Sequence, residues 1–176
     1  MTSDTYGKKH WLWQIIPPFS MLGILFATDS GPALMFLAGF YFFPALFSFI
    51  SIIAKLANFK HRKWFLLRPT LVILVLVALI FIAQWSYQAA LKNAISEAKT
   101  IESECRKILI CPTHPEGWQA NGARLNKQVV GGWLKYPLSY HYNATRFSIR
   151  IYQGPDLGAY ISGGVDTPFS VTSYHE

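Results

Sequence analysis

The sequence predicts an α-helical membrane anchor of three transmembrane helices, followed by a small extracytoplasmic α+β domain. Two observations carry this fold class. The first half holds three long stretches without a charged residue, 11–28, 30–54 and 69–91, whereas the second half holds none and alternates apolar with polar residues. A helical span needs about 20 apolar residues. We therefore expect a membrane domain over 11–87, with spans at about 11–28, 33–54 and 66–87.

The positive charges lie beside the predicted spans and indicate the topology. Of the net charge of +7, residues 1–87 carry seven Lys or Arg against two acids, a balance of +5. These cations fall in the amino-terminal segment 1–10, in the loop 55–65 and at Arg68, and the link 28–32 has none. Because loops rich in Lys and Arg stay in the cytoplasm, both basic segments should be cytoplasmic and residues 88–176 should lie outside, in the periplasm of a bacterial cell.

Two further features agree with a protein of the bacterial inner membrane. Tryptophan favours the headgroup region, and four of the six fall at predicted span ends: Trp11, Trp13, Trp64 and Trp85. The basic excess lies next to the bilayer and not in the aqueous domain, which argues against a nucleic-acid partner.

The first uncharged stretch leaves two alternatives open. Its Lys8-Lys9 start and apolar run are also typical of a cleaved signal peptide, although Leu25 would occupy a position that prefers a small residue. Pro17-Pro18 removes two backbone donors, so the segment could instead lie at the membrane interface.

The spans lack the groups that ion-coupled transport requires. No acidic residue falls within any predicted span, and the interior offers only Gln14, Gln84 and scattered Ser. A channel is therefore a lesser alternative, which ion flux in liposomes would test.

The third span should continue as a long amphipathic helix in the aqueous domain. Apolar residues recur there with spacings of 4 and 3, which places them on one stripe: Tyr87, Leu91, Ala94, Ala98, Ile101, Cys105 and Ile108. The stripe needs a cover. The following sheet is the simpler cover, and self-association of the helix 87–108 with a second chain is the alternative.

Cys105 and Cys111 are the only cysteines. Residues six apart point about 240° apart on a helix, so a bond between them requires the helix to unwind near Lys107. Pro112 ends the helix in any case. In an oxidising compartment we expect the Cys105–Cys111 disulfide, which is favoured over a metal site with His114 because no fourth ligand is evident.

Alternating strands follow the helix. Residues 138–142 and 147–152 alternate around a turn at 143–146, and 157–161 and 169–174 add short strands, with 129–134 as one more. We predict a four- or five-stranded antiparallel sheet with one face on the long helix. This layout resembles the architecture of type IV pilins, but the chain has two earlier spans and no pilin processing site.

No catalytic, metal-binding or cofactor-binding pattern is recognisable, so we expect no enzyme and no cofactor. A membrane-bound enzyme using His114 and Glu116 stays a lesser alternative, which alanine at both positions would test. The tail is rich in Trp, Tyr and Arg, the residue types that dominate protein interfaces. The candidate partner-binding residues are His141, Arg150, Tyr152, Trp118 and Trp133.

These features favour a periplasmic protein-binding domain on a membrane anchor. An immunity protein against a toxin that acts on the membrane or in the periplasm is the leading hypothesis. An accessory subunit of an envelope, pilus or secretion complex is the alternative. An adjacent toxin gene is expected only for the first.

Overall fold

The computed structural model describes residues 30–56, 67–121, 124–153 and 157–175. The predicted segment 1–10, the first predicted span and most of the loop 55–65 lie outside the described residues. The chain divides into two compact units. The first contains residues 34–82, and the second combines Asp29–Ala33 with Ala83–Glu176.

The first unit contains most of α2 (Gly31–Leu56) and the beginning of α3 (Leu67–Ile108). Proline is favoured in the first turn of a helix, and Pro32 stands there in α2. Large apolar side chains of both helices are exposed. Among the described residues, one helix is long and apolar enough to cross a membrane by length and composition, the segment Thr70–Ile108 of α3.

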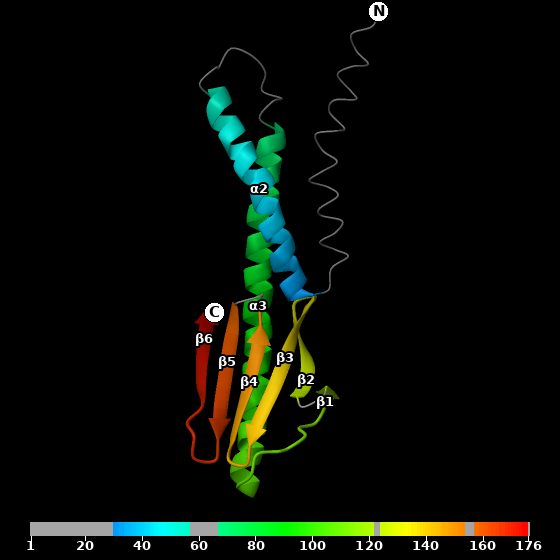
Figure 1. The fold of residues 1–176 in the computed structure, drawn as a ribbon, viewed down its shortest axis with the longest axis vertical. Coiled ribbons are helices and arrows are strands. Elements are labelled where there is room, and N and C mark those ends of the chain that lie inside the picture. The colour runs from blue at the N-terminus through cyan, green and yellow to red at the C-terminus, as the bar shows by residue number, and fades with distance from the viewer. Residues whose placement is uncertain (1–29, 57–66, 122–123, 154–156, 176) are drawn as a thin grey trace, which may run out of the picture. The chain divides into compact units, whose positions relative to one another are not determined.

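The prediction that the third apolar stretch continues into the domain is confirmed. α3 runs without interruption for 42 residues, and its later turns pack on the sheet (Figure 1). The face buried there contains Ala83, Tyr87, Ala90, Ala94, Ala98, Ile101 and Cys105. Small alanine side chains let the strands approach the helix closely. The stripe is thus covered within one chain, although Ile108 at the helix end is exposed.

The sheet has six antiparallel strands rather than the predicted four or five. Their order in space is their order in sequence, so each strand pairs with the next in an uncrossed meander (Figure 1). The strands are β1 (Gln119–Asn121), β2 (Arg124–Gly131), β3 (Leu134–Asn143), β4 (Arg146–Tyr152), β5 (Leu157–Gly164) and β6 (Ser170–His175).

Two local differences account for the strand count. β1 has only three residues and therefore shows no alternation in the sequence. The stretch 129–134, predicted to be one strand, contains the end of β2, a two-residue turn and the start of β3. Gly132 adopts a φ of 63°, which glycine accepts without strain, and this allows the reversal between Gly131 and Leu134.

The face of the sheet toward α3 forms the core of the domain. Alternate residues of β3, β4 and β5 are buried there, as the period of two requires: Leu134, Tyr136, Leu138, Tyr140, Phe147, Ile149, Ile151, Ala159 and Ile161. Paired residues on neighbouring strands share this face, for example Tyr140 with Ile149 and Leu138 with Ile151.

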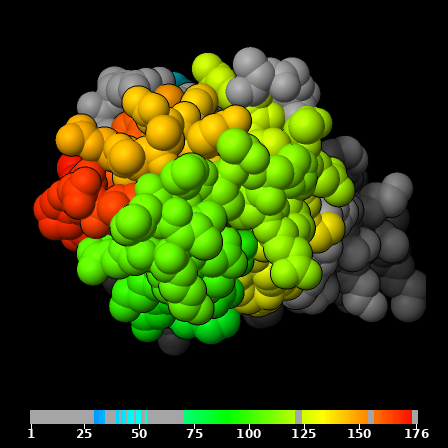
Figure 2. Space-filling model, turned by 90° about the horizontal axis from the view of Figure 1, so that it is seen from below, coloured from blue at the N-terminus to red at the C-terminus, as the bar shows by residue number. Residues whose placement is uncertain are grey.

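The predicted Cys105–Cys111 disulfide is present. α3 ends at Ile108, and Leu109 has a φ of 55°, so the chain turns back and brings the two sulfurs together. The Cys111 amide then donates a hydrogen bond of 2.8 Å to the carbonyl of Ala144 in the β3–β4 turn. Figure 2 looks onto this end of the domain, where the end of α3 and the following loop (green) lie against the strands. A loop this short contributes about 2 kcal/mol by the chain-entropy relation.

Candidate protein-binding surface

The face of the sheet that points away from α3 is the candidate site, and we call it the outer sheet face. One row of paired residues crosses all six strands there: Gln119, Asn126, Ser139, Arg150, Tyr160 and Thr172. These residues alternate with the core residues along each strand, which places the row on the opposite face, although Ser139 is itself only 4% exposed. A β-meander thus gathers side chains from residues 119 to 172 in a single line.

Arg150 forms the centre of this face together with two tyrosines. Its guanidinium carbon lies 4.7 Å from the ring centroid of Tyr152 and 5.3 Å from that of Tyr160. Both distances are within the range of cation–π attraction. The two rings hold the long Arg150 side chain in position, which lowers the conformational entropy that binding a partner would remove.

The outer sheet face carries positive charge. Arg124, Lys135, Arg146 and Arg150 all occupy its alternation positions, and Lys127 points to the other face. None of the residues of the six described strands is acidic. A surface with cations and aromatic rings and no acid in its strands is complementary to an acidic partner.

An open pocket of about 840 Å³ lies beside this centre, over β1 to β3. Side chains of the outer sheet face line much of it, including Gln119, Arg124, Asn126, Gln128, Ser139 and Tyr152. Ser139 Oγ and Asn126 Oδ1 lie 3.3 Å apart across the strands. The pocket therefore offers amide, hydroxyl and guanidinium groups to a partner.

The five predicted contact residues occupy three places. His141 is exposed on the outer sheet face, diagonal to Arg150 on the next strand, and Tyr152 completes the group. Trp133 is exposed in the turn between β2 and β3. Trp118 is buried in the core, so it supports the domain and presents no surface to a partner.

Sequence reasoning missed Tyr160, because only the pairing of β4 with β5 places it opposite Arg150. The signal available was the alternation in β5, but that strand begins after an irregular turn and its register cannot be read from spacing alone.

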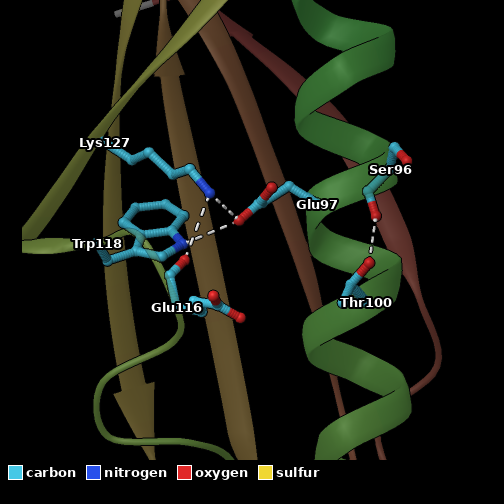
Figure 3. Close-up of polar contacts among 6 residues, drawn as sticks. All are labelled: Ser96, Glu97, Thr100, Glu116, Trp118 and Lys127. Carbon is cyan, nitrogen blue, oxygen red and sulfur yellow. Dashed lines mark hydrogen bonds and ion pairs between the residues drawn. The ribbon is translucent and has the colours of Figure 1, made fainter.

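Trp118 belongs to a polar contact that joins the sheet to α3. Its ring nitrogen donates to Glu97 Oε1 at 3.3 Å, and Lys127 Nζ lies 2.5 Å from the same oxygen (Figure 3). Lys127 also reaches the carbonyl of Glu116 at 3.4 Å. One half-buried carboxylate of the helix thus accepts from the loop before β1 and from β2, which fixes their positions relative to α3.

We expect Glu97→Ala to lower the free energy of unfolding by about 2 kcal/mol, because the buried Trp118 N–H loses its acceptor and Lys127 loses its counter-ion. Glu97→Gln keeps an acceptor and should cost about half as much. Glu104→Ala, which removes an exposed carboxylate from the same helix, is the control. Denaturant unfolding of the full chain in micelles measures all three, and equal stabilities for Glu97→Ala and Glu104→Ala would contradict the assignment.

Two core tyrosines have shifted acidities. Burial, with a smaller contribution from Tyr87, raises the pKa of Tyr136 to about 12, and its hydroxyl donates to the carbonyl of Ala83 at 3.4 Å. Burial also raises the pKa of Tyr140, with smaller contributions from Tyr142 and Glu104. The Tyr140 hydroxyl donates to the carbonyl of Pro112 at 2.8 Å. These groups stabilise the fold and lie away from the outer sheet face.

The two residues with the chemistry of an acid–base pair lie in the same loop. His114 and Glu116 are both exposed in the loop between α3 and β1. Within the described ranges, no group of three or more His, Cys, Asp or Glu is placed to hold a metal ion.

Comparison with models of known families, with characterised proteins and with solved structures finds no match to this chain. Its function must therefore be inferred from the surface itself.

Proposed function

We propose that this protein is a bacterial inner-membrane protein whose periplasmic domain binds another protein, without catalysis of its own. The observation that carries the proposal is the outer sheet face. It presents Arg150 held between two tyrosines, beside an open pocket, in a set of strands without acidic residues. Aromatic residues and arginine are the types that contribute most to protein interfaces.

In this proposal, the membrane domain of the protein crosses the bilayer three times, with the amino terminus in the cytoplasm. Contacts of the link between the first two spans support this topology. Ser30 forms a parallel bridge with Lys135 of β3, and the ring of Tyr136 lies directly against Gly31. These contacts are expected if the link and the domain lie on the same side of the membrane, as the charge distribution predicts. α2, at 26 residues, is about 39 Å long and sufficient for the second crossing.

Charge identifies the kind of partner. Four cations on a face without strand acids repel a basic surface and attract an acidic one, which favours encounter with an acidic protein. Because the domain is held beside the bilayer, the partner should be one that reaches the outer surface of the inner membrane.

Within this class, an immunity protein against a toxin that acts on the membrane or in the periplasm is our leading proposal. The small size, the anchored domain and a preformed binding face suit an inhibitor that acts by occupying another protein. An accessory subunit of an envelope, pilus or secretion complex would use the same face. A toxin gene next to this one is expected only for an immunity protein.

The test is a pull-down from native membranes with the full chain. We expect Arg150→Glu to reduce recovery of the partner at least about tenfold, because it places an acid opposite an acidic surface and removes the cation–π contacts. Lys99→Glu makes the same charge change at an exposed position of α3 and should leave recovery unchanged. An unchanged set of partners for Arg150→Glu would refute the outer sheet face as the binding surface.

A further inference from the structure

The position of the β2–β3 turn along α3 indicates a second interaction surface. β2 runs back along the helix toward the apolar stretch. Lys127 contacts Glu97, and further along the strand the carbonyl of Val130 accepts a hydrogen bond of 2.8 Å from Asn93 Nδ2. Each step toward the end of β2 thus reaches an earlier residue of α3.

The turn itself lies against the uncharged part of α3. Gly131 packs directly on the backbone of Ser86 and on Ala90, and a Cβ at Gly132 would lie 2.9 Å from the ring of Trp85. No charged residue occurs between Arg68 and Lys92. The β2–β3 turn, defined as Gly132 and Trp133, is therefore level with the end of the helix segment that we assign to the membrane.

Three large apolar or aromatic side chains are exposed at this level, together with the charged Lys135, which pairs with Val130. Trp133 is 47% exposed, Val130 48% and Trp85 55%. Indole rings prefer the headgroup region, where the ring leaves water and the N–H stays hydrated. Trp85 and Trp133, which both lie beside the proposed span, would therefore both be in the headgroup region, where indole rings are most stable.

We propose that the β2–β3 turn inserts into the outer headgroup region of the bilayer, with Trp133 as the inserted side chain. This inference depends on the proposed membrane span of α3. The lipid contact holds the domain against the membrane surface, in addition to its connections to the anchor through α3 and through the link before α2. The outer sheet face then has a constant height above the bilayer.

The test uses single thiols in the full chain, which has no other free cysteine because Cys105 and Cys111 are bonded. Trp133→Cys and Val130→Cys place an NBD label at the turn. Val77→Cys places it on an exposed position of the apolar part of α3, and Thr145→Cys places it in the β3–β4 turn at the other end of β3. Each protein is reconstituted in phosphatidylcholine–phosphatidylglycerol vesicles containing lipids brominated near the headgroup or near the chain end, and the intact mass confirms the native disulfide.

We expect the label at 133 to lose more than about half of its emission to lipids brominated near the headgroup, and the label at 145 to lose little. The label at 77 should be quenched mainly by the lipids brominated near the chain end. If the labels at 133 and at 130 were quenched as little as the label at 145, while the label at 77 was quenched, the inference would be overturned and the span would stand. If the label at 133 were quenched mainly by the lipids brominated near the chain end, as expected for the label at 77, the inference would also be overturned. Absence of quenching at 77 would refute the span, and the inference with it.

Discussion

The domain should lose roughly 4 kcal/mol of stability between pH 10 and pH 12, a larger effect than we expect from any single substitution. The cause is the burial of Tyr136 and Tyr140 between α3 and the sheet. The ordinary tyrosine pKa is 10.0, and that of Tyr136 in the folded domain is about 12. In this interval the unfolded chain releases both phenolic protons, whereas the folded domain keeps them until the pH approaches the folded-state pKa of Tyr136.

The sign follows from proton binding. When the folded state binds more protons than the unfolded state, the free energy of unfolding falls as pH rises, by about 1.4 kcal/mol per pH unit for each such group. The stabilising contribution is therefore complete below pH 10 and is lost as pH rises toward the folded-state pKa. Because native domains are stable by only about 5–15 kcal/mol, this loss is a large fraction of the free energy of unfolding.

Removing the hydroxyl groups of Tyr136 and Tyr140 tests whether these two residues cause the pH dependence. Tyr136→Phe should change stability little at pH 7, because its hydrogen bond to Ala83 is long at 3.4 Å, whereas Tyr140→Phe loses a bond of 2.8 Å and about 1 kcal/mol. The double variant should lose much less stability between pH 10 and 12 than the natural protein. Tyr152→Phe, on the outer sheet face, is the control. Denaturant unfolding in micelles across this range measures the slopes, and equal slopes for the double variant and the control would reject the explanation.

The long-range features of this fold were readable because they depend on repeated patterns. The stripe from Tyr87 to Cys105 predicted the continuous helix and its need for a cover, and the alternation over 138–142 and 147–152 predicted two strands of the sheet. The apolar spacing does not show where the helix ends, however. Ile108 continues the spacing, but α3 finishes there and leaves it exposed.

Features that depend on a single contact were beyond sequence patterns. Tryptophan is a residue type common in protein interfaces, and only the contact of Trp118 with Glu97, 21 residues earlier, shows that it belongs to the core. β1 is too short to alternate, and a two-residue turn at Gly132 was hidden in an apolar run. The partner that places Trp118 is distant in sequence, whereas β1 and the turn at Gly132 are local features that are too short to show a period.

The end of β2 packs so closely on α3 that Gly131 should be a sensitive position of the sheet. A Cβ there would overlap the carbonyl oxygen of Ser86 and lie 2.9 Å from the Cβ of Ala90. The obstacle at Ser86 is a backbone atom inside α3, so no side-chain rotation can relieve it. We expect Gly131→Ala to lower the free energy of unfolding by about 3 kcal/mol, the upper part of the range for overpacking.

The structural change caused by Gly131→Ala should also be local. Gly131→Ala should move the end of β2 away from α3, weaken the Asn93–Val130 hydrogen bond and speed amide exchange in the first residues of β3, while the disulfide end of the domain keeps its protection. Val130→Ala, a change at an exposed side chain of the same strand, is the matched control and should cost less than about 0.5 kcal/mol. Denaturant unfolding and hydrogen exchange of the full chain in micelles measure both effects. If Gly131→Ala were as stable as Val130→Ala, the strand could not be packed on the helix backbone, and the level of the β2–β3 turn along α3 would have to be reassigned.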